Sequence, residues 1–521
     1  MVRPSKFSMA PLSVLLPLFQ FLAPVASQQV IETDVLILGG GMTGVSAAHS
    51  LYHTHGIEDF LIVEARHELG GRVQDHQLGN YSVEFGANWI QGLGDNPIWK
   101  LAEKYGVKNR YSDWKKIDYF TERGWDGEDG PLSRAVDRYE EEVYPQIVAD
   151  AGRRKELGMS DLSLRAGLRM NGWTASTPEE WTAEYFLHDW ESGEPPVQSS
   201  YIKSVESYNS TFVESGNATN NIVIDQAGYK QVILRHAAEI PNINQKVHLN
   251  EVITSVSYTN SSVTATTKSG LTIRAKKAIC TFSLGVLQHS DVTFSPQLPS
   301  SKLEAIANFH MATYTKIFAR FRPEDKFWNE TEFWLYADPD ERGYYPMWQP
   351  LDIPGFLPGS GIVFATLTGQ QAIRAEHQSD EEVKREFLAV LRRLYGEDKV
   401  PEPVEFTFPR WTRDPLFRGT FTNCGAGVTT EQQEALKAPV GGDHDRERTL
   451  WFAGEHTSRK HFGYLHGAFR EGRSSAGEVA DCLLRGCQQS EETLIAKRDA
   501  EEFMDLSHLG KRKRMYVPDY V

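Results

Sequence analysis

The apolar positions of this chain fall mostly into short runs, separated by glycine-rich turns and by segments with helical spacing. Residues 34–38 (Asp-Val-Leu-Ile-Leu) and 60–63 (Phe-Leu-Ile-Val) are two such runs, and their β-branched members are typical of buried parallel strands. Residues 45–52, which lie between them, have helical character. A strand, a helix and a second strand in this order predict a βαβ unit, and therefore an α/β fold.

Other segments follow the same two periodicities. Residues 222–234 predict a strand with a helix opening at Gly228, and an apolar strand is predicted to begin at Tyr314, after a helix-like run. Near the C-terminus, a strand at 450–457 should enter a turn before a helix that opens at 463–468. The other predicted strands are 247–253, 256–273 as part of a hairpin, and 278–281, which continues into 283–287.

The composition is that of a folded, acidic protein. Its 521 residues suggest about two to four domains. With 40% hydrophobic and 24% charged residues, the chain is neither collagen-like, nor a coiled coil, nor wholly disordered. The net charge of −15 argues against binding a phosphate backbone, which needs clustered Lys and Arg, and favours cationic ligands. We therefore expect no nucleic-acid partner.

The first 27 residues have the pattern of a secretory signal peptide. Arg3 and Lys6 give a positive start, residues 9–23 are mostly apolar, and small residues at 25–27 allow cleavage after Ser27. The apolar run is shorter than the roughly 20 residues that span a bilayer, and no later stretch is long and apolar enough. We therefore expect a secreted, extracellular protein without a transmembrane span.

Secretion gives weight to two further patterns. Cys482 and Cys487 can close a small disulfide loop, but four cysteines allow three pairings and the sequence does not choose among them. N-x-S/T sequons become candidate glycosylation sites in this compartment. They lie at Asn80, Asn209, Asn217, Asn260 and Asn329.

The first predicted strand runs directly into the glycine-rich turn 39–44, a G-x-G-x-x-G pattern. Gly39 permits the tight turn, Gly41 lets the backbone approach a pyrophosphate, and Gly44 allows the helix to pack closely on the strand. Phosphates would lie at the positive N-terminus of that helix. The second strand ends at Glu64, 20 residues after Gly44, where a carboxylate can bind two ribose hydroxyls. This combination predicts a dinucleotide site; NAD(P), FAD and a loop without ligand are the alternatives.

The residues that follow favour FAD. Glu64-Ala65-Arg66 precedes Gly70-Gly71-Arg72, and then Gly86-Ala87-Asn88-Trp89. This arrangement resembles the flavin-containing amine oxidase family, in which the glycine-arginine turn wraps the FAD pyrophosphate. The guanidinium of Arg72 is also suited to phosphate oxygens because of its planar fork, although a surface salt bridge is the alternative for it.

Residues 450–457 and 463–468 form a C-terminal motif that extends the resemblance. In the family, the acid that matches Glu455 holds the ribityl-phosphate region, and the N-terminus of the helix at 463–468 faces the flavin, where it stabilises negative charge. His456, His461 and His466 do not share one helical face, so we expect no metal. The resemblance implies FAD contacts from Gly39, Gly41, Met42, Thr43, Gly44, Glu64, Arg66, Gly71, Arg72, Ala87, Asn88, Trp89, Val252, Trp411, Glu455, Tyr464 and Leu465.

The resemblance implies a fold class as well: a two-domain α/β fold with a Rossmann-like FAD-binding domain and an interleaved α+β substrate-binding domain. The FAD-binding domain would comprise residues 28–95, 220–300 and 441–490. The substrate-binding domain would comprise residues 96–219 and 301–440, and residues 491–521 would form a charged tail.

Lys316 is the candidate catalytic residue. It lies in an apolar strand and should point inward by alternation, where burial lowers the pKa of a lysine and lets it organise water. In the family, the matching lysine contacts flavin N5 through a water; an exposed strand lysine is the alternative. Phe421 and Tyr464 match the two aromatic walls that flank the amine, and Tyr314 opens the same strand as Lys316. Thr420 occupies the position of the cysteine that bonds the flavin in monoamine oxidases, so FAD is expected to be non-covalent.

Within the family, the chain is most similar to secreted plant-type polyamine oxidases, whose tunnels are lined by acids. Glu191 matches one of these acids, but the other position holds Gln91, and an amide cannot pair an ammonium as a carboxylate does. The resemblance implies that a neutral polyamine or amine loses a hydride equivalent to FAD. An aldehyde, a shorter amine and, with O2, hydrogen peroxide would follow.

Three other functions are open from the sequence. An L-amino acid oxidase on the same fold would need an arginine for the substrate carboxylate, and Arg320, Arg342 and Arg410 are candidates. A histone-lysine demethylase fits poorly with a secretion signal, and a non-catalytic FAD-fold protein fits poorly with the intact motifs. The sequence leaves the oligomeric state open, and a monomer is the working expectation.

Overall fold

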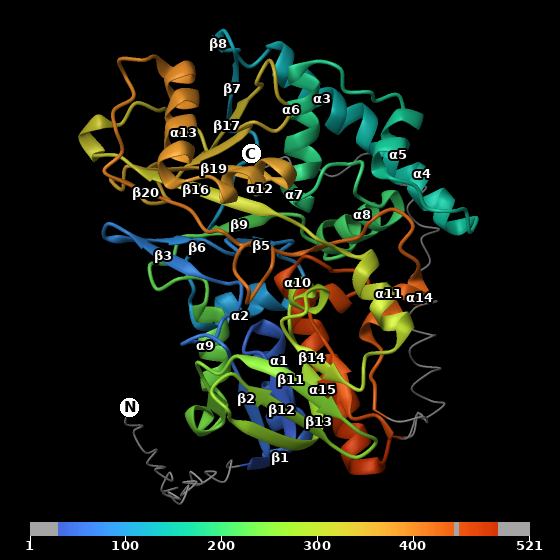
Figure 1. The fold of residues 1–521 in the computed structure, drawn as a ribbon. Helices are drawn as coiled ribbons and strands as arrows, with labels where there is room; N and C mark the ends of the chain where they lie inside the picture. The colour runs from blue at the N-terminus through green and yellow to red at the C-terminus, as the bar shows by residue number, and fades with distance from the viewer. Residues whose placement is uncertain (1–29, 442–446, 488–521) are drawn as a thin grey trace, which may run out of the picture.

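The computed structural model describes residues 30–441 and 447–487, which form mixed α/β layers around two large sheets (Figure 1). The predicted signal peptide (1–27) and charged tail (491–521) lie outside the described residues. Within these two ranges, no helix combines the length and the apolar composition that crossing a bilayer requires.

The lower sheet in Figure 1 has eight strands, and the glycine-rich turn follows the carboxyl end of its interior strand β1. Its order is β10-β2-β1-β13-β12-β11-β14, with β22 paired to β13. β1 lies between β2 and β13, parallel to both, and residues 35–38 have no exposed surface, which explains the continuous apolar run. The strands are β1 (Val30–Leu38), β2 (Phe60–Val63), β10 (Val247–His248), β11 (Ile253–Tyr258), β12 (Val263–Thr267), β13 (Thr272–Cys280), β14 (Thr293–Ser295) and β22 (Leu450–Phe452).

Two helices from opposite ends of the chain pack together on this sheet: α1 (Met42–His55) and α15 (Leu465–Arg485). Gly472 of α15 makes this possible, since a Cβ there would lie 2.2 Å from the Ser46 Oγ of α1. Ser46 in turn donates to the Phe469 carbonyl at 3.1 Å. The C-terminal motif is therefore held beside the N-terminal glycine-rich turn. The other helices of this half are α2 (Pro97–Tyr105), α9 (Gln231–Ala238), α10 (Leu284–Gln288), α11 (Ser300–Asn308) and α14 (Thr430–Lys437).

The upper sheet has seven strands in the order β20-β16-β19-β18-β17-β7-β8. One face packs against α12 and α13, and part of the other face packs against a layer of helices between residues 131 and 208. The strands are β7 (Ile117–Thr121), β8 (Gly124–Trp125), β16 (Tyr314–Arg320), β17 (Phe333–Tyr336), β18 (Met347–Pro350), β19 (Ile362–Thr368) and β20 (Glu405–Thr407). The helices are α3 (Pro131–Arg138), α4 (Tyr144–Glu156), α5 (Leu164–Met170), α6 (Pro178–Glu184), α7 (Trp190–Ser192), α8 (Tyr201–Tyr208), α12 (Gly369–His377) and α13 (Asp380–Tyr395).

Three π-helical turns interrupt the helical layer on the upper sheet. They are η1 (Tyr139–Val143), η2 (Tyr185–Asp189) and η3 (Asn209–Val213). Each adds a residue to a helical turn and so rotates the side chains that follow it, a device that is frequent at functional sites. η2 runs directly into α7, the short helix that carries Glu191.

Small sheets join the two halves. β5 (Trp89–Gln91) and β6 (Asn109–Tyr111) flank β9 (Asn220–Val223) in one of them. The others are β3 (Asp75–Leu78) with β4 (Tyr81–Glu84), and β15 (His310–Met311) with β21 (Thr422–Asn423). Three short 3-10 turns complete the described elements: η4 (Ile243–Gln245), η5 (Pro323–Asp325) and η7 (Glu455–Thr457).

The predicted strand at 247–253 is wrong as a single element. Only Val247–His248 forms a strand, parallel to β2, and β11 begins at Ile253. Between them, Asn250 adopts a positive φ of 60°, and the Glu251 N–H donates to the Glu64 carbonyl at 3.0 Å. The segment thus turns across the carboxyl end of β2, a tertiary contact that periodicity does not encode. The antiparallel pairing predicted around 256–273 is confirmed as the β11-β12-β13 meander.

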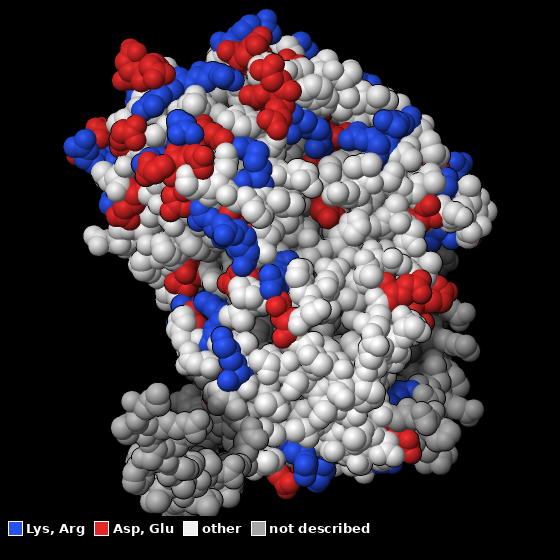
Figure 2. All heavy atoms as spheres, viewed as in Figure 1, with Lys and Arg blue, Asp and Glu red and all other residues white. Residues whose placement is uncertain are grey.

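The surface features fit this frame. In Figure 2, acidic and basic residues are interspersed on the visible face rather than gathered into one large patch of a single sign. Of the predicted glycosylation sites, Asn80, Asn217, Asn260 and Asn329 are exposed and Asn209 is half-buried. The structure pairs Cys482 with Cys487, whereas Cys280 and Cys424 are free and buried.

Candidate functional site

A cavity of about 620 Å³ runs between the two halves and gathers most of the predicted site residues. All five predicted substrate contacts line it. So do all predicted FAD contacts except Gly44 and Arg66, while Lys316 lies just behind the wall. These residues come from both ends and the middle of the chain, so the cavity exists only in the folded protein.

Gly39, Gly41 and Gly71 form a cradle of bare backbone on one side of the cavity. Gly39 has a φ of +110°, and a Cβ on Gly44 would lie 2.0 Å from the Gly39 carbonyl oxygen. Gly41 and Gly71 face each other so closely that a Cβ on Gly71 would lie 3.1 Å from the Gly41 Cα. Gly44 therefore packs the helix on the strand, as predicted, and the bare backbone of Gly41 and Gly71 leaves room for a pyrophosphate.

Glu64 is held at the end of β2 by backbone donors. Gly40 N–H donates to Oε2 at 2.7 Å and Arg66 N–H to Oε1 at 2.8 Å. Burial raises the pKa of Glu64, and these N–H donors oppose that rise. The Arg66 side chain turns to the Gly71 carbonyl at 3.2 Å rather than into the cavity. A fixed acceptor at this point fits the ribose of a dinucleotide.

Glu455 ties the N-terminal and C-terminal motifs together. Its Oε1 accepts from Arg72 Nη1 at 2.8 Å, and its Oε2 accepts from the Gly463 N–H at 2.8 Å. The same Arg72 nitrogen donates to the Thr420 carbonyl at 2.7 Å. The rest of the Arg72 guanidinium stays available to an anion. The donor set, the cradle and Glu64 together fit FAD.

Lys316 is buried, with its ammonium on a cavity-wall carbonyl. Its Nζ donates to the Gly86 oxygen at 2.6 Å, and only 2% of its surface is exposed. Because both faces of β16 are buried, burial alone does not show which way the Lys316 side chain points. Lys316 lies on the same face of β16 as Phe318, and Phe318 packs on β4 and not on α12. Burial lowers the pKa of Lys316 and raises that of nearby Glu84, while each charge opposes the shift of the other. Glu84 keeps one carboxylate oxygen without a hydrogen-bond partner.

Three predicted residues meet at the other end of the cavity, although they are far apart in sequence. Glu191 Oε1 accepts from Tyr464 OH at 2.6 Å and from Gln91 Nε2 at 3.0 Å. Tyr314 and Phe421 pack with ring centroids 5.9 Å apart, and both line the cavity. This end therefore combines one carboxylate with an aromatic enclosure, which can orient an amine and exclude water.

Sequence reasoning missed most of that enclosure. Its aromatic side chains come from the interrupted helices and from the loop before β7, and they are Trp114, Tyr139, Tyr144, Trp190 and Tyr208. No local signal marks them, because aromatic residues in helices more often belong to the core. His188 also lines the cavity, and burial lowers its pKa to about 3, so it is neutral.

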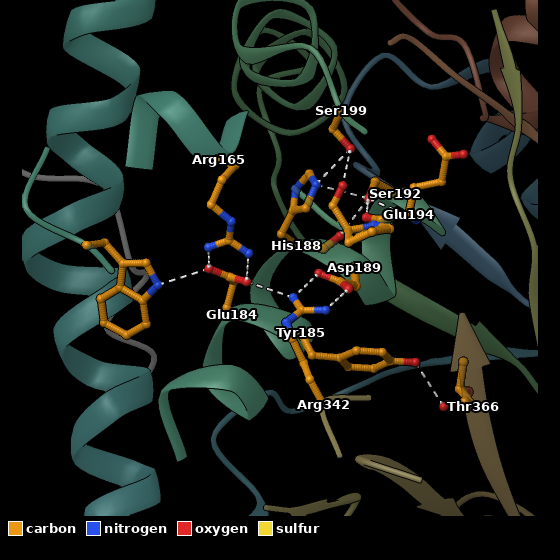
Figure 3. A network of polar contacts seen from close by, with 12 residues as sticks. Arg165, Glu184, Tyr185, His188, Asp189, Ser192, Glu194, Ser199, Arg342 and Thr366 are labelled. Carbon is orange, nitrogen blue, oxygen red and sulfur yellow. Dashed lines mark hydrogen bonds and ion pairs between the residues drawn. The ribbon is translucent and has the colours of Figure 1, made fainter. Parts of the chain in front are cut away.

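A network of buried ion pairs includes Asp189, two residues before Glu191 in the chain (Figure 3). Arg342 donates to both oxygens of Asp189, at 2.7 and 2.8 Å, and to Glu184 Oε1 at 2.7 Å. Arg165 and the Trp173 indole also donate to Glu184. Asp189 is 2% exposed and ends η2, two residues before Glu191. The network thus anchors the turn that presents Glu191.

This network removes Arg342 from the candidate carboxylate-binding arginines. Arg320 pairs with Glu405, and Arg410 with Asp380 and two backbone carbonyls. None of these three arginines lines the cavity. Among the described residues, the one arginine in the cavity lining is Arg72. No cysteine of the described part of the chain lines it either, so the cavity offers no thiol for a covalent flavin bond.

Among the described residues, the three C-terminal histidines are not gathered into a cluster of possible metal ligands. His461 and His466 hydrogen-bond each other, Nδ1 to Nε2 at 3.2 Å, and His466 stacks on Tyr464 at 5.1 Å. In the described ranges, one group meets metal-ligand distances, and it consists of His49, His236 and Glu239, outside the cavity. There Lys104 and Tyr105 already contact Glu239, which satisfies its carboxylate without an ion.

Comparisons with known proteins agree with this geometry. A family model described as flavin containing amine oxidoreductase matches residues 42–480. Polyamine oxidase 6 of Oryza sativa subsp. japonica is 34% identical over 467 residues, covering 86% of this chain and 90% of that protein. Polyamine oxidase 1 of Zea mays is 34% identical over 477 residues, with the same coverage.

The fold has solved counterparts. Wild-type putrescine oxidase bound to putrescine superposes with a TM-score of 0.69 at 19% identity, covering 87% of this chain and 99% of that one. At that identity the likeness concerns the fold alone. Together with the family model, it confirms the predicted fold class.

Proposed function

Since the chain belongs to the flavin-containing amine oxidoreductases and is an FAD-dependent amine oxidase, we propose that it oxidises polyamines. The proposed substrates are spermine, spermidine or their acetylated forms. The observation that carries the proposal is the meeting of Glu191, Gln91 and Tyr464 beside aromatic walls, at the end of a cavity whose other end fits FAD. The curated relatives that are about one-third identical are polyamine oxidases by name.

FAD would supply the oxidant, accepting a hydride equivalent from the carbon next to the amine nitrogen and passing two electrons to O2 to give hydrogen peroxide. The protein's part is to place that carbon. Phe421 and Tyr464 would hold the chain of the amine between them, and Glu191 would attract a positive nitrogen. Hydrolysis of the resulting imine yields an aldehyde and a shorter amine.

Lys316 would act through its neighbours. Its ammonium binds the Gly86 carbonyl, one residue from Ala87 in the cavity wall, and a water there could bridge it to the reacting atoms. No strong base is required if the amine arrives neutral. The rate should therefore fall as the pH drops below the pKa of the bound amine.

Two further parts of the proposal concern the cell. The signal-like segment supports export, and the exposed sequons support glycosylation at Asn80, Asn217, Asn260 and Asn329, with half-buried Asn209 as the weakest of the five. FAD would be held without a covalent bond, supported by Thr420 at the family's cysteine position.

Peroxide release tests the function. The purified yellow protein would be given spermine, spermidine, their N-acetyl forms, a monoamine and L-amino acids, with products identified by mass. Polyamine turnover is expected. Turnover of only amino acids or simple monoamines would overturn the polyamine assignment while leaving the amine oxidase class intact.

A further inference from the structure

The amine end of the cavity holds a single negative charge. Here the amine end means the part lined by β5, by residues 114–208, and by Tyr314, Phe421 and Tyr464. Glu191 is its only acidic side chain among the described residues, and it contains no Lys or Arg. The other acids that line the cavity are Glu64, Glu251, Asp291 and Glu455, on the cofactor side.

That one charge is already partly used. Tyr464 and Gln91 both donate to Oε1 of Glu191, which leaves Oε2 with only a long contact of 3.4 Å to the same amide. The backbone of Gln91 is fixed, because β5 pairs with β9 and Asn96 donates to the Gln91 carbonyl at 2.7 Å, and its side-chain amide is held by its contact with Glu191. The site therefore offers one open carboxylate oxygen to one ammonium. The neutral amide of Gln91 beside it provides no negative charge for a second ammonium.

The remainder of the amine end is neutral and contains spare hydroxyls. Ser204 and Ser207 lie one turn apart on α8, and Tyr144 comes from the facing helix α4; all three residues line the cavity. Their hydroxyls are buried and have no hydrogen-bond partner in the protein. Serines inside a helix usually bond to the carbonyl one turn back, so two unpaired serines on one face are unusual.

These surroundings favour different chemistry at the two ends of a substrate. A second ammonium near Ser204 and Ser207 would lose its water without gaining a carboxylate. An amide group there would instead meet hydroxyl donors, since rotation about one side-chain bond turns a serine oxygen toward the cavity. The aromatic walls can cover the methylene chain between the two ends.

Resting on the proposed function, we propose that the cavity selects an N-acylated polyamine over the free polycation. One positive nitrogen lies at Glu191, the reacting nitrogen is neutral, and the acyl amide lies at Ser204, Ser207 and Tyr144. Gln91 is the residue that determines this selection, because its neutral amide leaves Glu191 as the one negative charge that the described residues provide at the amine end.

The first test compares substrates that differ by one charge. Peroxide release would be measured for spermidine and for its two mono-acetyl forms, with kcat and KM separated. At least one acetyl form should exceed spermidine by about tenfold or more in kcat/KM. If spermidine is equal or better, the selection is wrong and the polyamine function stands; if no polyamine yields peroxide, the proposed function itself fails.

The second test changes Gln91. Gln91→Glu should raise kcat/KM for spermidine about tenfold and reduce the preference for the acetyl form, whereas Gln245→Glu, the same charge change on an exposed surface residue, should leave the ratio unchanged. Anaerobic calorimetry with 1,10-diaminodecane and decylamine gives a readout without turnover: the wild type should bind the monoamine more tightly, and Gln91→Glu the diamine. If a folded, yellow Gln91→Glu protein still binds the monoamine more tightly than the diamine, the proposed role of Gln91 is overturned.

A third variant keeps the test open if Gln91→Glu does not fold. The double variant Ser204→Ala, Ser207→Ala should raise KM for the acetyl form about fivefold and leave the Kd of decylamine, measured by the same anaerobic calorimetry, within about twofold. Equal effects on both ligands would show that the hydroxyls do not recognise the amide.

Discussion

Replacing Arg342 with Met tests whether the buried network in Figure 3 presents Glu191. Asp189 would lose both of its close donors while remaining 2% exposed, whereas Glu184 would keep Arg165 and Trp173. Removing one partner of a buried pair costs about 3–5 kcal/mol. With an unfolding entropy near 2 cal/mol/K per residue over about 450 residues, this corresponds to about 3–5 °C in melting temperature, if the molecule unfolds in one transition.

The loss should depend on pH with a definite sign. Burial already raises the pKa of Asp189 to about 6 with Arg342 in place. Without Arg342 the folded pKa rises further above the unfolded value, so stability is lost as the pH rises between the two. The gap to the wild type should therefore be larger at pH 8 than at pH 5. Glu191 follows Asp189 by two residues, so a displaced Asp189 should also displace Glu191. The variant should therefore show a several-fold higher KM for the amine and a smaller change in kcat.

The assay is thermal unfolding of the FAD-loaded protein at a matched scan rate, with steady-state kinetics beside it. Arg392→Met is the control, because Arg392 pairs with the largely exposed Glu402 and such surface pairs are worth about 0–1 kcal/mol. Asp189→Asn combined with Arg342→Met removes the stranded charge and should recover most of the loss. If Arg342→Met melts like Arg392→Met, or if the double variant recovers nothing, the buried-charge reasoning is refuted.

Other positions give independent predictions. Gly44→Ala should yield protein with little bound FAD, since the new Cβ would lie 2.0 Å from a backbone oxygen of the turn. The control is Gly152→Ala in α4, where a Cβ would have nothing within 4 Å; it should keep full flavin absorbance and gain about 0.5–1 kcal/mol in stability. Equal flavin content in the two variants would contradict this prediction. Lys316→Met should slow turnover or reoxidation without releasing FAD, measured by anaerobic reduction and oxygen mixing, and unchanged kinetics would remove Lys316 from the mechanism. Glu194 raises the pKa of His310 across a 3.1 Å contact, so this contribution to stability is complete below the ordinary pKa of histidine and is lost as the pH rises through the raised value. His310→Gln should flatten that part of the melting temperature against pH, and an unaltered profile would argue against the pair.

Local features of the sequence determined the cofactor end. A turn, a strand and the start of a helix depend on neighbours within a few residues, so residues 34–44 predicted β1, the turn and α1 closely, and Glu64 fell at the end of β2 as expected. The segment 247–253 failed for the opposite reason. It is apolar enough for a strand, but its backbone turns at Asn250 to follow the carboxyl end of β2.

Periodicity alone also left the candidate residues without partners. Arg342, Arg320 and Arg410 looked alike as possible carboxylate ligands, and only the folded protein shows all three engaged outside the cavity. Likewise, Tyr144, Trp190 and Tyr208 have the apolar character of core residues, and only the packing of the helical layer, with π-helical turns next to all three, places them in the wall of a cavity.

By itself, then, the sequence determined the glycine-rich cradle and the apolar runs that form β1, β2 and β16, whereas the acid at position 191 was identified only through the resemblance to the family. The tertiary structure decided that Gln91, Glu191 and Tyr464 share one hydrogen-bonded cluster, and that Glu191 is the only acid at that end among the described residues. The physical reason is distance along the chain. Side-chain patterns report whether a residue is buried, but which distant residue faces it depends on how helices and sheets pack.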